Sequence, residues 1–213
     1  MEKLKNYKNL FFIGIGGIGM SALAIILKER GFNIIGSDKS NSKTIEKLIN
    51  KGIKVYINHD PSHITKEIDA IVYTNAISND NPELLRAKEL GIPTLDRATV
   101  LDIVSSPKFT IGISGTHGKT TTTSMISKIF LKAGLSPSLA IGGEIEEIDG
   151  SGYEGNGKYF IYEACEAYGS FLKLHPNIAV ITNIDSDHLD YYKNIEYIKQ
   201  TFEKYLRENL PPF

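Results

Sequence analysis

The chain has 213 residues, of which 41% are hydrophobic and 23% are charged, with a formal net charge of −1. So small a net charge argues against nucleic acid and anionic membrane as partners. No apolar run approaches the roughly 20 residues of a membrane span, and the first residues lack the apolar core of a signal peptide. The single cysteine, Cys165, excludes an intrachain disulfide, so we expect a soluble protein of the reducing cytoplasm.

The first half of the chain alternates short β-branched runs with amphipathic stretches. We predict strands over residues 10–13, 32–35, 53–56, 70–73 and 92–95, and helices over residues 18–30, 44–50, 82–90 and 98–104. Repeated alternation of this kind is typical of an α/β fold with a parallel, doubly wound sheet. We assign residues 1–105 to this first domain.

The pattern restarts after a short linker at residues 105–108. We predict strands over residues 109–113, 138–141, 159–162 and 178–181, and helices over residues 119–133 and 195–207. The glycine-rich, acidic stretch 142–157 indicates a loop or an irregular hairpin. Residues 106–213 therefore form a second α/β domain, with fewer strands than a P-loop sheet usually has.

A glycine-rich loop follows the first predicted strand. It reads Gly14-Ile-Gly16-Gly17-Ile18-Gly19 and opens the first predicted helix, where free N–H groups and the helix dipole favour a phosphate. Asp38 lies 24 residues after Gly14, near the end of the second strand, where dinucleotide-binding folds place a ribose-binding carboxylate. The pattern predicts NAD or another nucleotide diphosphate, and the alternative is a packing turn without a ligand.

A second glycine loop, Gly115-Thr-His-Gly118-Lys119-Thr120, follows the strand predicted at residues 109–113. It departs from the Walker pattern because Ile113 stands where that pattern has glycine. Lys119 can still contact β- and γ-phosphate oxygens, and the Thr120 hydroxyl can bind Mg²⁺. This loop predicts a nucleoside triphosphate site, with a turn that binds no nucleotide as the alternative.

Acidic residues and a histidine follow two later strands of the second domain. Because the carboxyl ends of parallel strands share one edge of a sheet, we expect them beside the second loop, where they could bind a divalent cation. They are Glu163, Glu166, Asp185, Asp187, His188 and Asp190. The alternative is a set of solvated loop charges.

Several other residues have no clear chemistry. His117 is either a loop-shaping or a solvent-facing residue, His63 is expected at the surface, and the sequence does not decide the role of His59. Cys165 has no histidine placed to activate it, so we expect a buried, unreactive thiol.

Taken together, these motifs resemble the Mur ligases from near the N-terminus to Phe213. The strings that carry the resemblance are Phe12-Ile-Gly-Ile-Gly-Gly-Ile-Gly-Met-Ser21, Gly36-Ser-Asp38, Asn81-Pro-Glu83, Gly91-Ile-Pro93, Arg97-Ala98, Gly115-Thr-His-Gly-Lys-Thr-Thr-Thr122, Gly169-Ser-Phe-Leu172 and Thr182-Asn-Ile-Asp-Ser-Asp-His-Leu-Asp190.

The resemblance implies a site for each domain. The Rossmann-like first domain would bind the UDP of the substrate, not NAD, through Gly16, Gly17, Ile18, Gly19 and Asp38. The P-loop second domain would bind ATP through Gly115, Thr116, His117, Gly118, Lys119, Thr120 and Thr121. Lys119, Glu166 and His188 would be catalytic, with Thr120 on a first Mg²⁺ and Glu166 and His188 on a second. Glu166 is preferred to Glu163 because its spacing to Ser170-Phe171 fits the family pattern.

The resemblance also implies a reaction of peptidoglycan precursor synthesis, and so of cell-wall biogenesis. An ATP-dependent ligase would join L-alanine to the lactyl carboxylate of UDP-N-acetylmuramate through an acyl phosphate. A relative that attaches a recycled murein tripeptide shares the same strings and stays open. A non-catalytic remnant that binds a UDP-sugar or a nucleotide is the third alternative.

Three departures from the family pattern accompany the resemblance. The loop at residues 149–155 lacks the asparagine and arginine that family members often have there. The acidic string reads Glu163-Ala-Cys-Glu-Ala-Tyr168, so two carboxylates of the family pattern are missing. Family members are longer, so the resemblance implies a partial ATPase domain, no C-terminal ligase domain, and activity only with the missing sequence or a complementing chain. We therefore expect the apolar faces around Ile111, Ile113, Val180 and Ile181 to lack cover.

Overall fold

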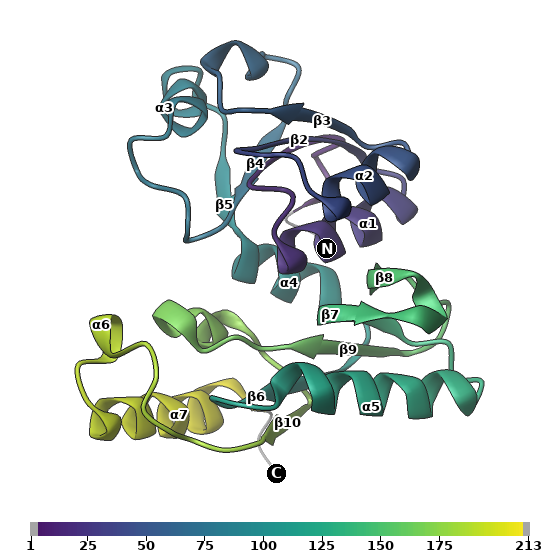
Figure 1. Ribbon diagram of the computed structural model, residues 1–213, viewed down its shortest axis with the longest axis vertical. Helices are drawn as coiled ribbons and strands as arrows, with labels where there is room; N and C mark the ends of the chain where they lie inside the picture. Colours follow the sequence, from purple (N-terminus) through teal and green to yellow (C-terminus); the bar gives the residue numbers. More distant parts are fainter. Residues whose placement is uncertain (1–3, 211–213) are drawn as a thin grey trace. The chain divides into compact units, whose positions relative to one another are not determined.

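The computed structural model describes residues 4–210, apart from the side chains of Leu189 and Asp190. The chain divides into two compact units, Met1–Ile103 and Val104–Phe213, drawn from purple to teal and from teal to yellow in Figure 1. Among the described residues, no helix has the length and apolar character needed to cross a membrane.

The first unit is built on a parallel sheet of five strands in the order β3-β2-β1-β4-β5. Its strands are β1 (Asn9–Ile13), β2 (Asn33–Asp38), β3 (Lys54–Ile57), β4 (Ala70–Tyr73) and β5 (Thr94–Asp96). The expected α/β fold with a doubly wound parallel sheet is confirmed. Strand β2 runs past the predicted end because Ser37 and Asp38 pair with Tyr56 and Ile57 of β3.

The helices of this unit cover both faces of the sheet. They are α1 (Ile18–Glu29), α2 (Lys43–Asn50), α3 (Pro82–Glu89) and α4 (Arg97–Ser105), with a short 3-10 turn η2 (Pro61–His63). Right-handed crossovers from β1 to β3 and from β4 to β5 run in opposite directions, which puts α1 and α2 on one face and α3 on the other (Figure 1). Phe11 and Ile13 of β1 pack accordingly with Leu84 and Ala87 of α3.

The second unit is built on a five-stranded sheet in the order β10-β6-β9-β7-β8. Its strands are β6 (Phe109–Ser114), β7 (Ser138–Ile145), β8 (Gly150–Tyr153), β9 (Tyr159–Glu163) and β10 (Ile178–Ile181), and β8 is antiparallel to β7. The stretch 142–157 is therefore an irregular hairpin, with a register shift between Ala140 and Ile145.

The helices of the second unit are α5 (Lys119–Lys132), the 3-10 segment η4 (Ala167–Lys173), α6 (Leu189–Tyr192) and α7 (Ile195–Asn209), and η3 (Glu146–Ile148) is a further short turn. Ile111 and Ile113 are only 6% and 0% exposed, since they lie in a core cluster that Ile126 and Phe130 of α5 flank. Our expectation that both would lack cover is wrong. Val180 is half-buried against the same cluster.

Candidate functional site

The loop between β1 and α1 is tied to the end of β2. The N–H groups of Gly14 and Ile15 both donate to the carbonyl of Ser37, at 2.9 and 3.0 Å. The N–H of Gly16 donates to Oδ2 of Asp38 at 2.8 Å, and a Cβ at Gly16 would lie 2.9 Å from the same oxygen. The first glycine loop and Asp38 therefore lie together, as the sequence predicts.

A pocket of about 370 Å³ opens at this loop. Its lining comprises Gly14, Gly16, Gly17, Asp38, Lys39, Ser40, Ser42, His59, Thr74, Ala76 and Ile77. Gly17 is the N-cap of α1 and no side chain caps that helix, so its positive end favours an anion. Of the five residues expected at UDP, Ile18 and Gly19 do not line the pocket but form the first turn of α1, where a Cβ on Gly19 would lie 2.8 Å from Nη1 of Arg97.

A buried carboxylate behind this pocket was missed by the sequence reasoning. Glu83 is 0% exposed and contacts Nδ1 of His59 and Nδ1 of His63, both at 2.8 Å, and the hydroxyl of Ser37 at 2.6 Å. The expectation that His63 is an ordinary surface residue is wrong, because its side chain is 13% exposed and stacks on Tyr56 at 4.0 Å. The only sequence signal, Asn81-Pro-Glu83, indicated a helix start.

The second glycine loop joins β6 to α5 and contacts the segment after β10. Gly115 has φ 129° and lies so close to Thr182 that a Cβ would come within 2.1 Å of its Oγ1. The Thr116 hydroxyl accepts from the N–H of Asp185 at 2.9 Å. Gly118, at φ 79°, is the N-cap of α5. The uncapped N-terminus of a long helix and a tight loop make the geometry expected for phosphates.

His117 shapes this loop through its backbone. Its N–H donates to Oδ1 of Asn183 at 3.0 Å, and its carbonyl accepts from the side chains of Thr182 and Asn183 at 2.6 and 2.9 Å. Its ring is 64% exposed, with Nε2 3.7 Å from Oδ2 of Asp185. The structure supports both roles considered for His117, one for the backbone and one for the ring.

Lys119, Glu166 and His188 meet at the carboxyl edge of the second sheet. The Lys119 ammonium donates to Oε1 of Glu166 at 3.0 Å and lies 2.9 Å from Oε2 without hydrogen-bond geometry. It also donates to the carbonyls of Gly115 and Thr116, at 2.5 and 3.0 Å. Nε2 of His188 is 3.7 Å from Oε1 of Glu166. The three residues predicted as catalytic are brought together.

Glu163 contacts the next residue of the loop instead. The Thr120 hydroxyl donates to Oε2 of Glu163 at 2.8 Å. Gly142 lets β7 approach, since a Cβ there would lie 2.3 Å from the same oxygen, and a Cβ on Gly143 would lie 2.8 Å from Cγ2 of Thr120. Thr121 is exposed on the first turn of α5. The two glutamates after β9 thus have separate partners in the loop.

The side chains at this edge of the sheet can supply some, but not all, of the ligands that a cation needs. Oε2 of Glu166 is buried and accepts no hydrogen bond, and His188 is the nearest imidazole. Within residues 4–210, no cluster of three or more histidine, cysteine or acidic side chains could bind a metal on its own. Mg²⁺ usually takes one or two carboxylates together with phosphate oxygens and water, so the carboxylate of Glu166 suits a cation that a nucleotide also binds.

The other acids of the predicted cluster do not converge on this point. The carboxylates of Asp185 and Asp187 accept from the N–H groups of the residues that follow them, both at 2.7 Å. The side chain of Asp190 lies outside the described ones. The local hydrogen bonds of Asp185 and Asp187 indicate turn residues.

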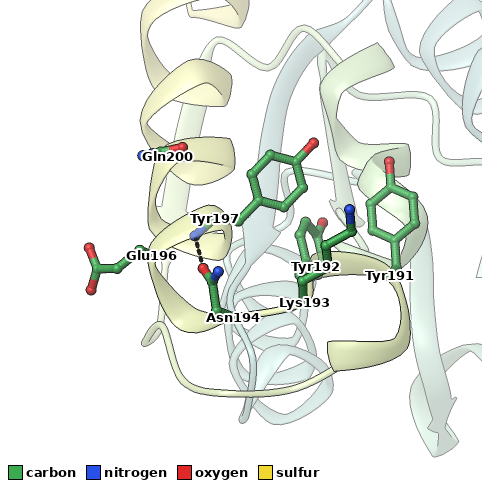
Figure 2. Close-up of a pocket in the computed structure, with 7 residues that line it drawn as sticks. All are labelled: Tyr191, Tyr192, Lys193, Asn194, Glu196, Tyr197 and Gln200. Carbon is green, nitrogen blue, oxygen red and sulfur yellow. Dashed lines mark hydrogen bonds between the residues drawn. The ribbon is translucent and has the colours of Figure 1, made fainter.

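A tyrosine-rich hollow of about 550 Å³ lies between α6 and α7, and Figure 2 shows its lining: Tyr191, Tyr192, Lys193, Asn194, Glu196, Tyr197 and Gln200. Tyr192 links it to the Glu166 site, because its hydroxyl donates to the carbonyl of Glu166. Burial is the main cause that raises the pKa of the Tyr192 phenol. The sequence reasoning did not single out these residues.

Two family models match the chain. Residues 9–108 match the Mur ligase family, catalytic domain, and residues 113–211 match the Mur ligase middle domain. UDP-N-acetylmuramate–L-alanine ligases of Acetivibrio thermocellus and Clostridium kluyveri are 55% and 54% identical over 94% and 95% of this chain. The chain covers 43% and 44% of their lengths, so it spans about two fifths of these curated relatives.

Solved structures agree with the family models. A UDP-N-acetylmuramate–alanine ligase from Thermotoga maritima is 32% identical with a TM-score of 0.87, over 95% of this chain and 47% of that one. A UDP-N-acetylmuramate:L-alanyl-γ-D-glutamyl-meso-diaminopimelate ligase from Neisseria meningitides is 31% identical with a TM-score of 0.88, over 96% and 69% of the two chains. With both of its halves matched by family models and both of its phosphate loops in place, the chain belongs to the Mur ligase family.

Proposed function

We propose that this chain carries the UDP-sugar-binding and ATP-binding parts of a cytoplasmic ligase that joins L-alanine to UDP-N-acetylmuramate. Residues 1–105 would bind the UDP-sugar and residues 106–213 the ATP. The observation that carries the proposal is the meeting of Lys119, Glu166 and His188 beside a glycine loop, in a different unit from the first glycine loop. Curated relatives that are more than half identical to this chain are named for this reaction.

The two loops suit two different phosphorylated ligands. The first loop has no lysine and lies beside Asp38, which suits a nucleoside diphosphate whose charge the helix end can balance. The second loop has Lys119 and Thr120, which suit a triphosphate and its Mg²⁺. UDP is favoured over NAD for the first loop because the names of the relatives contain a UDP-sugar.

The proposed reaction has two steps. A lactyl carboxylate oxygen attacks the γ-phosphorus of ATP, the bond to the β-γ bridging oxygen breaks, and ADP leaves an acyl phosphate behind. The amine of L-alanine then attacks the acyl carbon, and phosphate leaves from the tetrahedral intermediate as the amine loses a proton. Neither step needs an oxidant, so the protein's main task is to position the two reactants of each step and to balance charge.

Named side chains would perform that task. Lys119 would exchange its carbonyl and Glu166 contacts for β- and γ-phosphate oxygens, as a point charge on the transferred group. Glu166 and His188 would hold one Mg²⁺ and Thr120 another. When bound, these cations would neutralise the charge that develops during phosphoryl transfer.

Two alternatives have support on specific points. The Neisseria meningitides structure is named as a ligase of UDP-N-acetylmuramate with the tripeptide L-alanyl-γ-D-glutamyl-meso-diaminopimelate. It resembles this chain as closely as the alanine ligase from Thermotoga maritima does. Release of phosphate in the presence of L-alanine or of the tripeptide, assayed in a protein that contains this chain and the rest of the ligase, separates the two reactions. A remnant that only binds nucleotides would release phosphate with neither.

Calorimetry on the 213-residue chain tests the assignment of ligands. We expect Lys119→Ala to weaken Mg²⁺-ATP binding at least about 10-fold, the loss expected for one charge-assisted phosphate contact, and to leave UDP-N-acetylmuramate binding unchanged. Lys132→Ala, at the exposed far end of α5, is the control. Binding of NADH without binding of UDP-N-acetylmuramate would contradict the proposal.

A further inference from the structure

The carboxyl group of Glu83 has no role in the function proposed so far, although the residue is 0% exposed and contacts three side chains. We propose that Glu83 is a positioning residue of the UDP pocket, which fixes the orientation and tautomer of His59 so that Nε2 accepts a hydrogen bond from the nucleoside. The inference rests on the proposed function, because it takes UDP as the occupant of the pocket.

Glu83 is held in place from several elements. It is 0% exposed, in the first turn of α3, where Oδ1 of Asn81 caps its N–H at 2.9 Å. Its Oε2 accepts from the Ser37 hydroxyl at 2.6 Å and contacts Nδ1 of His59 at 2.8 Å, while Oε1 contacts Nδ1 of His63 at 2.8 Å. Among the residues the structure describes, no lysine or arginine is paired with this carboxylate. Each oxygen of Glu83 contacts one imidazole, so a single carboxyl group orients both rings.

These contacts determine the tautomer of each imidazole. Each Nδ1 lies 2.8 Å from a carboxylate oxygen of Glu83, so we assign the ring hydrogen of His59 and of His63 to Nδ1. The Ser37 hydroxyl, 3.1 Å from Nδ1 of His59, donates to Oε2 of Glu83, so its own oxygen is a second acceptor for that ring hydrogen. In this tautomer Nε2 of His59 is a hydrogen-bond acceptor. The ring of His59 lines the pocket, and its side chain is 17% exposed. Glu83 therefore determines which kind of group the pocket offers to a ligand at this point.

An acceptor nitrogen selects its partner by chemistry. It repels phosphate oxygens, which are acceptors too, and it pairs with a hydroxyl or an N–H. UDP offers both kinds of donor on its nucleoside part, namely the ribose hydroxyls and the imide N–H of uracil. Another acceptor in the pocket, Oδ2 of Asp38, already binds the N–H of Gly16. His59 thus adds an acceptor for the nucleoside, while the helix end of α1 serves the diphosphate.

Ser37 connects this arrangement to the phosphate loop. Its hydroxyl binds Glu83 while its carbonyl accepts from the N–H groups of Gly14 and Ile15. His63 supports the arrangement from the other side, since its ring lies on Tyr56 with an interplanar angle of 10°. Lys54 places its ammonium 4.6 Å from the centre of the Tyr56 ring. Substitution of Glu83 is therefore expected to change ligand binding in the pocket and not only the packing of the core.

Glu83→Gln is the sharpest variant because it keeps the shape and changes only the hydrogen bonds. The two imidazoles contact different oxygens of Glu83. A glutamine in the same orientation would place its NH₂ group, a donor, against one of the two Nδ1–H groups. At least one imidazole must change tautomer or break its contact. Glu89→Gln on the same helix is the matched control, because its side chain is 64% exposed and pairs only with Arg86 among the described residues.

Two measurements on the 213-residue chain test the inference. Nitrogen-15 NMR of the histidine side chains should report both rings as the Nδ1–H tautomer in the unmodified chain, with a change in Glu83→Gln and none in Glu89→Gln. Calorimetry should show UDP-N-acetylmuramate bound at least about 10-fold more weakly by Glu83→Gln, the loss of roughly one hydrogen bond. His59→Ala should show the same loss, and the double variant should show no further loss.

Nucleotide analogues identify the donor that His59 accepts from. If it is the 2′-hydroxyl, 2′-deoxy-UDP should bind equally well to the unmodified and the Glu83→Gln chains. If it is the imide, CDP should do so instead. If it is the 3′-hydroxyl, 3′-deoxy-UDP should show this behaviour. An equal loss of affinity for UDP and all three analogues in Glu83→Gln would contradict a nucleoside contact and overturn the inference.

Failure of the inference and failure of the proposed function give different results. An unmodified chain that does not bind UDP-N-acetylmuramate contradicts the proposed function itself. A chain that binds it, with a Glu83→Gln variant of unchanged affinity, leaves the function and overturns the inference. If Glu83→Gln fails to fold, His59→Ala decides, because its ring is partly exposed and its loss opens no deep cavity.

Discussion

Two glycines of the second phosphate loop are required for different reasons, and substitution by alanine should separate them. Gly115 has φ 129° and no space for a Cβ, which would lie 2.1 Å from Oγ1 of Thr182. Gly118 has φ 79° with no atom within 4 Å of a Cβ. We expect Gly118→Ala to cost about 1 to 2 kcal/mol of unfolding free energy for the left-handed backbone alone, and Gly115→Ala clearly more.

Urea unfolding of the second unit, followed by tyrosine fluorescence, measures both losses. Equal losses for the two variants would mean that Thr182 moves aside without cost, and the close approach at Gly115 would then not be the reason for that glycine.

Two buried tyrosines should make the second unit less stable in alkali. Burial raises the pKa of Tyr192 and of Tyr205 above the ordinary phenol value of 10. Above pH 10 the unfolded chain loses these protons while the folded chain keeps them. The unfolded state then binds fewer protons, so the unfolding free energy falls as the pH rises, by up to about 1.4 kcal/mol per pH unit for each tyrosine.

Tyr205→Phe tests this point. The Tyr205 hydroxyl is buried and has no hydrogen-bond partner among the described residues, so its removal should leave stability at pH 7 unchanged or higher. Urea unfolding between pH 8 and 11 should show a shallower decline in the variant. Parallel declines would show that Tyr205 does not stay protonated in the folded chain.

The sequence predicted those site residues that stand in one local motif. Lys119 and Thr120 follow a glycine loop directly, and the resemblance to the Mur ligases implied Glu166 rather than Glu163 through its spacing to Ser170-Phe171. Glu83 and His59 could not be found this way. Their contact joins residues 24 positions apart, and the one to Ser37 spans 46, so the arrangement exists only after β2, η2 and α3 have packed.

At the scale of elements, the start of α3 is fixed by one side chain. Oδ1 of Asn81 accepts from the N–H groups of Glu83 and Leu84, at 2.9 and 3.2 Å. We expect Asn81→Ala to cost about 1 kcal/mol, the usual value of an N-cap. Ser42→Ala at the start of α2 should cost less, because Ser42 accepts one longer bond, 3.3 Å from the N–H of Ile45.

Thermal unfolding of both variants checks this order, with hydrogen exchange of the α3 amides as the local readout. A larger loss in Ser42→Ala would show that cap geometry does not decide the stability of these helices. Since Asn81 also holds the backbone of Glu83, Asn81→Ala should reduce UDP-N-acetylmuramate affinity as well.

Strands and helices with a regular spacing of apolar residues could be predicted from the sequence, but the residues at which they end could not. Every strand and helix predicted from the sequence is present in the structure, but β2 and β7 extend beyond their predicted ends. The residues added to β7 include Gly142 and Gly143, whose missing side chains let the strand pass Glu163 and Thr120. A sequence shows glycines there but not what they approach, so a loop and a hairpin were equally good predictions for this stretch.

At the scale of the whole molecule, each unit has its candidate site at the point where the strand order of its sheet reverses. In the first unit β1 lies between β2 and β4, and the pocket takes residues from the carboxyl ends of all three strands. In the second unit β6 lies between β9 and β10, and Lys119, Glu166 and His188 follow those three strands. Ligands of open α/β sheets bind at such points, where the strand order reverses.

Because the described residues of each site belong to a single unit, we expect each ligand to protect mainly the unit that holds its glycine loop. UDP-N-acetylmuramate should slow hydrogen exchange at residues 14–19 and at the amides around Asp38 and His59. Mg²⁺-ATP should slow exchange at residues 115–121 and in the segment after β10.

The stability that ligand binding adds grows with the logarithm of the ratio of ligand concentration to Kd. Each ligand at about 100 times its Kd should therefore add about 2.7 kcal/mol to the unfolding free energy of its own unit. Lys119→Ala should weaken only the second pattern of protection and Glu83→Gln only the first. Protection of both units by either ligand alone would contradict the division into two independent sites.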